Sequence, residues 1–425
     1  MAKKKTTPPA TEAAAVPAQP YYLQRAHIKD FRSIRDAKVE FKPGLNIIIG
    51  ANGSGKTNFV RVVGSGIDMN KETNKILGAE AVFNLVGRKE LEIRYHRQRG
   101  QILDGNKIRA SDLVRQEVSI ATIDGNNGQG GSLFEALSDN KNLRFAYTDF
   151  IGCETLLLNH GIPVHYPLVD IALEFKVSDF FQPTPMVENF TKAVMLTFAF
   201  AITTAQYRSQ HGVLPTQRVA TIWNNALETH LKELNNWLNR YTPIKEVRPA
   251  ETNQFYENAA RETVVKSLSL EFKIQHDWLP FSELSSGTQR LFYLLSEITV
   301  TDKYLDDELN GFVPVDAKFD KVILLEEPEL GIHPDQLHKL LLFLREQSEK
   351  HQLIITTHSP QVLDMLNSDE LDRITICELD EKKGTQFRKL TKKKIATARK
   401  FMKDVGYLSD FWLYSSLEEK SPYTS

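Results

Sequence analysis

Four residues in the segment LNIIIGANGSGKTNF, residues 45 to 59, have the types and spacing of a phosphate-binding loop. They match the pattern G-x-x-x-x-G-K-[ST] as Gly50, Gly55, Lys56 and Thr57. Glycines let successive backbone N–H groups face an anion at a helix N-terminus, where the helix dipole also favours negative charge. Lys56 would add a cation at the terminal phosphates and Thr57 a hydroxyl ligand for Mg²⁺. Residues 50–57, called the phosphate loop below, therefore predict a nucleotide site that also includes Asn52 and Gly53.

Such a loop needs one carboxylate to hold the metal and another to orient the attacking water. The segment VILLEEPE provides both after an apolar run at residues 322–325 that predicts a buried strand. Glu326 follows that run as the predicted Mg²⁺ ligand, and Glu327 is the predicted general base. The next predicted strand, in IITTHSP, ends at His358, which we predict as a sensor of the terminal phosphate. The expected ligands of this site are a nucleotide and Mg²⁺.

A second turn rich in serine and glycine, ELSSGTQR at residues 283–290, precedes another predicted helix. This Ser-Gly turn has the features of an anion-binding site. The phosphate loop already surrounds the phosphates of this chain's own nucleotide. We therefore expect the Ser-Gly turn to contact a nucleotide held by another subunit.

The elements that must position these residues alternate between strand and helix. Short strands are predicted before the phosphate loop, and a helix is predicted from Lys56. After Phe281 the predicted order is helix, buried strand, helix after His333, strand and a polar C-terminal segment. This alternation predicts an α/β fold with a parallel sheet covered by helices. Strands with alternating character predict an added antiparallel layer at residues 89–97, 170–177 and 267–274.

The predicted division of the chain has four parts. Residues 1–20 combine lysine, proline, threonine and alanine with almost nothing to bury, and predict a disordered tail. Residues 186–210 and 217–241 are rich in helix formers and predict a helical hairpin. We therefore expect the two halves of one head at residues 21–180 and 263–425, with a helical insertion between them at residues 181–262.

Composition leaves the partner open. The 53 Lys and Arg nearly cancel the 54 Asp and Glu, so any surface for nucleic acid must be local. Only Cys153 and Cys377 are present, which fits neither a disulfide framework nor a thiolate metal site. The longest apolar run, residues 193–205, is too short to cross a bilayer, and the lysine-rich start lacks a secretory signal. These features predict a soluble cytoplasmic protein without a membrane partner.

The phosphate loop together with LSSGTQ, LLEEPE, GIHP and TTHSP resembles the motif set of the SMC, RecF and OLD branch of the ABC-type ATPases. The resemblance implies a homo-oligomer in which two heads clamp two ATP molecules at their interface. It implies that three residues of the Ser-Gly turn contact ATP in trans: Ser286, Gly287 and Gln289. The turn at residues 331–334 would couple the two sites, and Arg32 in FRSI would approach the nucleotide. Gln129 is a candidate for the family's glutamine loop, with a flexible glycine loop as the alternative.

Two departures from this family narrow the expected role. About 230 residues separate Thr57 from the Ser-Gly turn, too few for the long coiled coils of SMC proteins. About 65 residues follow His358 and the chain contains no D-x-D pair, so the Toprim nuclease domain of OLD-type proteins is not expected. The chain resembles the short OLD-like ATPases that act beside a separately encoded effector, often a Toprim nuclease, in prokaryotic anti-phage systems such as PARIS.

Two other roles stay open at this point. Residues 382–403 contain ten Lys or Arg and no acid, which suits contact with a phosphate backbone or an acidic protein, but also a solvated helix face. A DNA-repair ATPase similar to RecF is therefore the second hypothesis. The third is a scaffold in which ATP locks an oligomer and turnover is negligible.

Overall fold

The computed structural model describes the following residues: 20–68, 80–87, 90–104, 107–122, 134–137, 153–158, 170–171, 175–176, 216–250, 254–259, 263–266, 268–299 and 320–415. The predicted tail, except for residue 20, lies outside this part of the chain. The first arm of the predicted helical hairpin, residues 186–210, and Gln129 also lie outside it.

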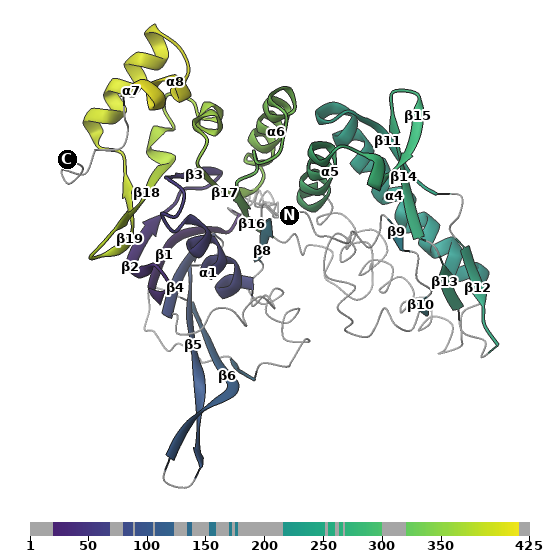
Figure 1. Cartoon of the computed structure of the whole chain (residues 1–425), viewed down its shortest axis with the longest axis horizontal. Helices are drawn as coiled ribbons and strands as arrows, with labels where there is room; N and C mark the ends of the chain where they lie inside the picture. The colour runs from purple at the N-terminus through teal and green to yellow at the C-terminus, as the bar shows by residue number, and fades with distance from the viewer. Residues whose placement is uncertain are drawn as a thin grey trace, which may run out of the picture.

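A twelve-stranded mixed sheet forms the centre of the head (Figure 1). Its parallel part is built from β8 (Cys153–Leu158), β16 (Asp320–Glu326), β17 (Gln352–Thr357), β3 (Leu45–Ile49) and β18 (Ile374–Asp380). Because β3, β16 and β17 run parallel, their carboxyl ends lie at one edge of the sheet. The phosphate loop, Glu327 and His358 follow those three ends, which is where open α/β sheets bind ligands.

The antiparallel part continues the same sheet from β18. Its strands, in spatial order, are β19 (Gly384–Lys389), β2 (Ile34–Glu40), β1 (Tyr22–Phe31), β4 (Glu80–Val86), β5 (Glu90–Asp104), β6 (Lys107–Thr122) and β7 (Phe134–Leu137). The β5–β6 hairpin projects from the body of the molecule (Figure 1). The predicted combination of a parallel sheet and antiparallel strands is confirmed. Of the described residues in the three predicted antiparallel segments, residues 90–97 lie in β5 of the central sheet, whereas residues 170–171, 175–176 and 268–274 lie in smaller sheets.

Two smaller antiparallel sheets lie beside the long helix α4 (Thr216–Tyr241) in Figure 1. One contains β10 (Phe175–Lys176), β13 (Thr263–Lys266) and β12 (Gln254–Glu257). The other contains β11 (Ile244–Pro249), β14 (Leu268–Ile274) and β15 (Asp277–Pro280), with β9 (Asp170–Ile171) paired to β14.

Two of the remaining helices, α1 (Lys56–Asp68) and α6 (Pro334–Gln347), follow strands that carry the predicted site, β3 and β16. The α-helices are α1 (Lys56–Asp68), α5 (Ser286–Thr299), α6 (Pro334–Gln347), α7 (Lys392–Asp404) and α8 (Leu408–Ser415). Short 3₁₀ helices are η4 (Phe281–Glu283), η5 (Pro360–Met365) and η6 (Leu371–Arg373). Helix α6 begins where the sequence predicts it, because His333 caps the helix and Pro334 occupies its first position. None of the described helices is long and apolar enough to cross a membrane.

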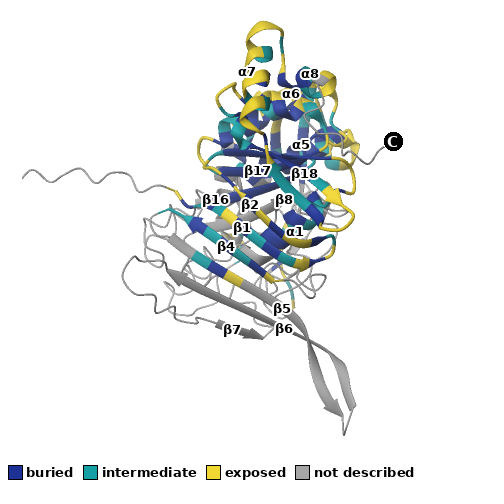
Figure 2. Cartoon of the chain, turned by 90° about the vertical axis from the view of Figure 1, so that its left-hand side faces the viewer, coloured by how far each residue is buried: buried dark blue, intermediate teal, exposed yellow. Residues whose placement is uncertain are grey.

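Alternation along the central strands divides the apolar residues between the two faces of the sheet. In β3, Ile47 packs into a cluster with α5 and α6, whereas Ile48 packs into a cluster with α1, β1 and β2. The same alternation holds in β17, where Ile355 and Ile354 point to opposite faces. Both faces are therefore covered, which explains why the central strands are continuous apolar runs (Figure 2).

Helix α4 shares its core with the head. Trp237 and Tyr241 lie 5.6 Å and 5.4 Å from the ring centroid of Phe343 in α6. Helix-forming composition predicts that a helix exists but not where it packs, so this contact could not be foreseen. The proposed domain boundaries at residues 180 and 262 stay a prediction, and the end of α4 belongs to the same apolar cluster as β3.

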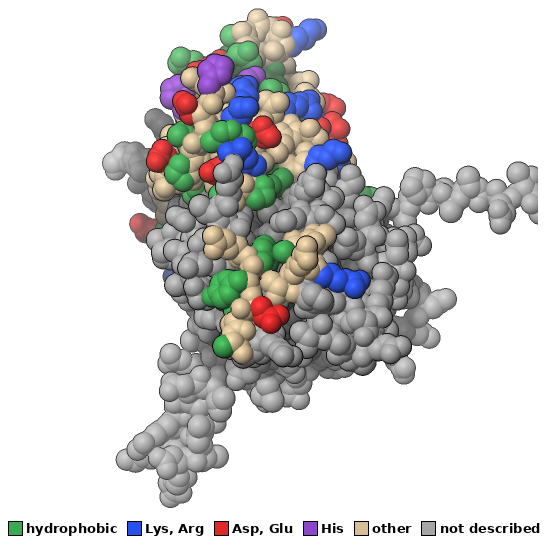
Figure 3. All heavy atoms as spheres, turned by 90° about the vertical axis from the view of Figure 1, so that its right-hand side faces the viewer, with side chains coloured by type: hydrophobic (Ala, Val, Ile, Leu, Met, Phe, Trp, Pro, Cys, Tyr) green, Lys and Arg blue, Asp and Glu red, His purple; other side chains and the backbone are tan. Residues whose placement is uncertain are grey.

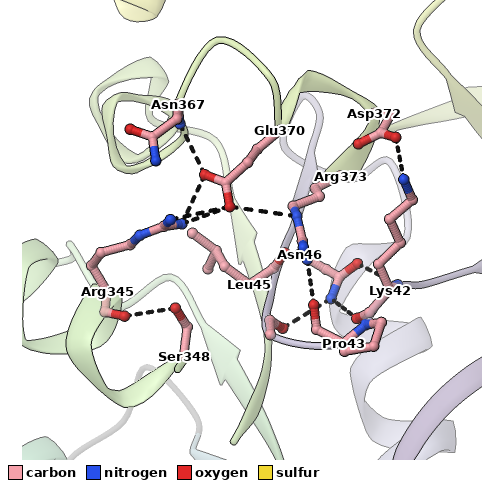
Figure 4. A network of polar contacts seen from close by, with 11 residues as sticks. Lys42, Pro43, Leu45, Asn46, Arg345, Ser348, Asn367, Glu370, Asp372 and Arg373 are labelled. Carbon is pink, nitrogen blue, oxygen red and sulfur yellow. Dashed lines mark hydrogen bonds and ion pairs between the residues drawn. The ribbon is translucent and has the colours of Figure 1, made fainter. Parts of the chain in front are cut away.

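A polar network holds the entrance to β3 (Figure 4). Glu370 accepts hydrogen bonds from both terminal nitrogens of Arg345, each at 3.1 Å, and lies 3.6 Å from Nε of Arg373. Arg373 in turn donates to the carbonyl oxygens of Pro43 and Leu45. The network therefore fixes the start of the strand that leads into the phosphate loop.

On the face drawn in Figure 3, Lys and Arg side chains are interspersed with Asp and Glu side chains over the described residues.

Candidate nucleotide-binding site

The phosphate loop connects β3 to α1 as predicted. The Nζ atom of Lys56 donates to the carbonyl oxygens of Gly50 and Ala51 at 2.8 Å and 3.0 Å, and the residue is 5% exposed. The ammonium group therefore lies against the backbone of the loop, at the N-terminus of α1. This arrangement gathers a cation and unpaired helical N–H groups around the place where phosphates would bind. At the tip of the loop, Asn52 and Gly53 are exposed.

The glycines of the loop are required by the backbone and by its neighbours. Gly53 and Gly55 have φ angles of +80° and +107°, which L side chains rarely adopt. A Cβ atom on Gly55 would lie 2.1 Å from Oγ1 of Thr385, and one on Gly50 would lie 2.1 Å from the carbonyl oxygen of Cys377. The loop therefore rests directly on β18 and β19, with no space for side chains between them.

The residues beneath the loop were not predicted from the sequence. Thr385 Oγ1 donates to the carbonyl oxygen of Ser54 at 2.9 Å and lies 2.8 Å from Oγ of Ser33. The Cys377 thiol contacts the same carbonyl oxygen at 3.5 Å. Burial raises the pKa of Cys377 to about 11, so the thiol stays protonated at neutral pH. In the sequence, the most evident feature of residues 382–403 is their positive charge. No pattern in that segment predicts the strand β19.

The two predicted Mg²⁺ ligands contact each other. The hydroxyl of Thr57 donates to Oε1 of Glu326, and Glu326 is 3% exposed at the end of β16. A hydroxyl and a carboxylate beside a phosphate site are the hard oxygen donors that Mg²⁺ takes in proteins. These residues therefore fit a Mg²⁺ ion that also binds nucleotide phosphates.

The predicted base and the predicted sensor also lie together. His358 Nδ1 is 3.2 Å from Oε1 of Glu327, and the two side chains are 39% and 20% exposed. Glu327 has a φ angle of +44°, which is uncommon for a residue with a side chain. Its N–H donates to Thr356 at 2.8 Å, and its carbonyl oxygen accepts from Nη2 of Arg290 at 2.6 Å. The backbone of Glu327 is thus held from both sides.

A third glutamate in the same segment was not predicted to have a role. Glu329 is 9% exposed, and it accepts a hydrogen bond from the hydroxyl of Thr357, the residue before His358. Burial raises the pKa of Glu329 above its usual range, and the hydrogen bond from Thr357 partly opposes that increase. The only sequence signal for Glu329 is its position two residues after Glu327.

The Ser-Gly turn forms the start of α5. Ser286 is exposed there, and Oγ of Ser285 accepts from the N–H of Thr288 at 3.3 Å. A Cβ on Gly287 would lie 3.1 Å from the carbonyl oxygen of Gly331, so the turn packs against the 331–334 turn. The side chain of Gln289 donates to the carbonyl oxygen of Phe281 at 2.8 Å. Within the described residues, no hydrogen bond joins Ser286, Gly287 or Gln289 to the phosphate loop; contact with ATP in trans stays a prediction.

Arg32 lies near the start of α1, the helix that the phosphate loop leads into. Its Nη1 atom donates to Oδ1 of Asn58 in α1 at 3.3 Å, and Nδ2 of Asn58 donates to Ser33 at 2.9 Å. Arg32 has a φ angle of +51°. Arg32 is therefore hydrogen-bonded to α1. Its approach to nucleotide stays a prediction.

Comparisons with known proteins agree with this geometry. Residues 25–137 match a family model described as "AAA domain", and residues 217–364 match one described as "AAA domain, putative AbiEii toxin, Type IV TA system". The Smc head domain with an extended coiled coil, bound to the C-terminal domain of ScpA and derived from Pyrococcus furiosus, superposes with a TM-score of 0.50. That match has 12% identity and covers 90% of this chain and 100% of the other.

Among curated proteins, the DNA replication and repair protein RecF of Acidothermus cellulolyticus is 52% identical over 42 residues, which is 10% of this chain and 11% of RecF. RecF of Desulfitobacterium hafniense is 34% identical over 82 residues, 17% of this chain and 22% of RecF. The matches thus span about a tenth to a fifth of the length of these relatives.

The fold and the motif matches define the class of protein. The chain has an SMC head-like α/β P-loop fold with a mixed sheet and helices. More specifically, it contains a P-loop head of the ABC/SMC-like ATPase type, which implies ATP binding.

Proposed function

We propose that this protein is a Mg²⁺-dependent ATPase whose heads associate around ATP. The observation that carries the proposal is the arrangement at one edge of the sheet. At that edge, Thr57 at the start of α1 contacts Glu326 at the end of β16. Glu327, directly after β16, contacts His358, directly after β17. When bound, Mg²⁺ would neutralise charge on the phosphates.

The residues of this chain then have distinct roles. Lys56 binds the terminal phosphates, and Glu327 accepts the proton of the attacking water. The contact with His358 orients the side chain of Glu327. Ser286 and Gly287 contact the nucleotide of a second head. Their place at the start of α5, with Ser286 exposed, supports this assignment.

Two substitutions test the enzymatic part of the proposal. Lys56→Ala removes a charged contact and should weaken ATP binding about 10- to 100-fold. Glu327→Gln should keep ATP binding, slow phosphate release about 10²- to 10⁴-fold and accumulate an ATP-bound assembly. Calorimetry, a phosphate-release assay and light scattering on the purified chain measure the three quantities. Phosphate release by Glu327→Gln at the wild-type rate would show that Glu327 is not the base.

We further propose that the heads hold or release a separate effector in antiviral defence. The description of the family model over residues 217–364 names a toxin of a Type IV TA system, which favours a system of more than one component. Four exposed large side chains near α8 support a partner surface: Val405, Tyr407, Leu413 and Tyr414.

The partner is tested by purifying tagged Glu327→Gln protein from its native host in ATP and Mg²⁺, followed by mass spectrometry. Lys56→Ala is the matched control, because it should not form the ATP-bound assembly. A stoichiometric protein with nuclease chemistry, absent from the control, would support the effector. Recovery of nucleic acid alone would favour the second candidate function. A filled assembly without phosphate release would favour the scaffold.

That second candidate is a DNA-repair ATPase similar to RecF. The observation that favours it is the outer face of α7, opposite the buried Ala398, where five exposed cations lie: Lys392, Lys393, Arg399, Lys400 and Lys403. Such a face suits phosphate backbones through salt-dependent contacts. Stimulation of phosphate release by duplex DNA, reduced by higher salt, would support this function.

A further inference from the structure

A buried arginine links the Ser-Gly turn to the proposed base. Arg290 lies in α5, four residues after Ser286, and is 4% exposed. Its Nη2 atom donates to the carbonyl oxygen of Glu327 at 2.6 Å, and its Nε lies 3.4 Å from the carbonyl oxygen of Pro328. A buried guanidinium is costly unless its donors are satisfied. Arg290 therefore depends on the position of the turn that carries Glu327, and that turn depends on Arg290.

Electrostatics keeps this cation in place. Burial lowers the pKa of Arg290, while the carboxylates of Glu329, Glu327 and Glu326 oppose that decrease. An arginine side chain stays charged in proteins. Arg290 is therefore a cation that faces Glu326, the proposed Mg²⁺ ligand at the end of β16, and the two glutamates in the segment after it, Glu327 and Glu329.

The conformation of Glu327 makes it sensitive to this contact. Its φ angle of +44° is unfavourable for a residue with a Cβ atom, so neighbouring contacts must hold it. The N–H of Glu327 is fixed by the end of β17, and its carbonyl oxygen also accepts from Leu330 at 3.1 Å. Among the described contacts of this backbone, Arg290 supplies the one that comes from α5.

Gly287, three residues before Arg290 in α5, is also packed against the segment after Glu327. Gly287 has the carbonyl oxygen of Gly331 and Oε1 of Gln336 at 3.1 Å and 3.2 Å from the place of a Cβ atom. Gly287 and Arg290 are three residues apart, a rise of about 4.5 Å, so both lie in the same turn at the start of α5. A shift of the Ser-Gly turn by a few tenths of an ångström must therefore reach Glu327.

We infer that Arg290 is a positioning residue that couples the Ser-Gly turn of each head to the base Glu327 of the same head. Contact of Ser286 and Gly287 with nucleotide on a second head then sets the geometry of Glu327 toward its own nucleotide. The inference rests on the proposed function, since it requires heads that associate around ATP. Its consequence is that one head hydrolyses ATP only when its partner is also loaded.

The first test separates positioning from a general structural role. Arg290→Lys keeps the charge but loses the planar fork that reaches two carbonyl oxygens. Arg373→Lys is the matched control, because Arg373 also donates to two backbone carbonyls, those of Pro43 and Leu45, outside the site. For each full-length protein, calorimetry gives the Kd for ATP, phosphate release gives kcat, and light scattering gives ATP-dependent association.

Arg290→Lys is expected to lower kcat at least tenfold, with Kd and ATP-dependent association within about twofold of wild type. Arg373→Lys is expected to lower the melting temperature without this selective loss of kcat. Equal effects of the two substitutions on kcat, or a proportional loss of ATP affinity in Arg290→Lys, would overturn the inference.

The second test addresses the coupling itself through a double-mutant cycle. Gly287→Ala displaces the Ser-Gly turn, because its Cβ would press on Gly331. The double variant combines Gly287→Ala with Arg290→Lys. If the turn acts through Arg290, the kcat of the double variant at saturating ATP will be no lower than that of the slower single variant. Multiplicative losses of kcat would refute the coupling. Absence of phosphate release from wild-type protein would refute the proposed function and this inference with it, whereas unchanged kcat in Arg290→Lys would refute only the inference.

Discussion

Substitution of Gly55 by alanine tests whether β19 supports the phosphate loop. The new Cβ would lie 2.1 Å from Oγ1 of Thr385 and 2.9 Å from Oγ of Ser33, at a φ angle of +107°. The backbone conformation should cost about 1–3 kcal/mol for a residue other than glycine. Crowding in a packed site should cost about 1–3 kcal/mol more. We expect the free energy of unfolding to fall by about 2–6 kcal/mol, the sum of these two costs.

The two contributions can be separated with variants of the same loop. Gly53 has a φ angle of +80° but no heavy atom within 4 Å of a Cβ, so Gly53→Ala should show only the backbone cost. Thr385→Ala removes the atoms nearest the new methyl group and loses a hydrogen bond worth about 1 kcal/mol. Gly55→Ala combined with Thr385→Ala should therefore recover about 1–3 kcal/mol relative to the sum of the single effects.

Urea denaturation of wild-type protein, the two single variants and the double variant gives the interaction energy directly. ATP affinity, measured by calorimetry on the same proteins, should decrease in Gly55→Ala and recover partly in the double variant. Additive free energies, within about 0.5 kcal/mol, would refute the idea that the loop rests on Thr385.

Two further predictions concern carboxylates that sequence analysis did not single out. Glu370→Ala should lower the free energy of unfolding by about 2–3 kcal/mol, because it leaves Arg345 without its charge-assisted hydrogen bonds. Asp372→Asn, in a half-exposed pair with Lys42, should cost less than about 1 kcal/mol in the same urea titration, and equal costs would contradict this ranking. For Glu329, the pKa is raised on folding, so its contribution to stability is complete below the unfolded-state pKa and is lost as pH rises through the folded-state pKa. Glu329→Gln should therefore gain stability relative to wild type as pH rises above the ordinary Glu pKa of about 4, and a difference independent of pH would exclude the raised pKa.

Local patterns were sufficient for the parts of the site that lie within a few residues of one another. Apolar runs that end in polar residues predicted β3, β16 and β17, and the ends of these strands carry the phosphate loop, Glu327 and His358. Such patterns report burial on both faces, which for a short strand is a strong signal. The roles assigned to these residues stay predictions, although the structure brings the base and the sensor to 3.2 Å.

The C-terminal segment was the weakest part of the sequence interpretation. The ten Lys and Arg of residues 382–403 favoured a surface for a phosphate backbone or an acidic protein, or a solvated helix face, yet residues 384–389 form β19 of the central sheet. In β19, Gly384 and Thr385 are buried while the following residues are partly exposed. The sequence of β19 has too little apolar alternation to predict a strand, and only its pairing with β18 and β2 makes it one.

By itself, the sequence predicted the chemistry, that is, which residues would bind phosphates, hold a metal ion or accept a proton, and it predicted the local strand or helix that presents each of them. Tertiary structure alone decided that Thr385 and Cys377 lie beneath a loop more than 300 residues earlier in the chain, and that Arg290 holds the backbone of Glu327. The reason is physical. A motif is formed by neighbours in the chain, whereas these contacts depend on the order of strands in the sheet and on the packing of helices against it, which no local pattern specifies.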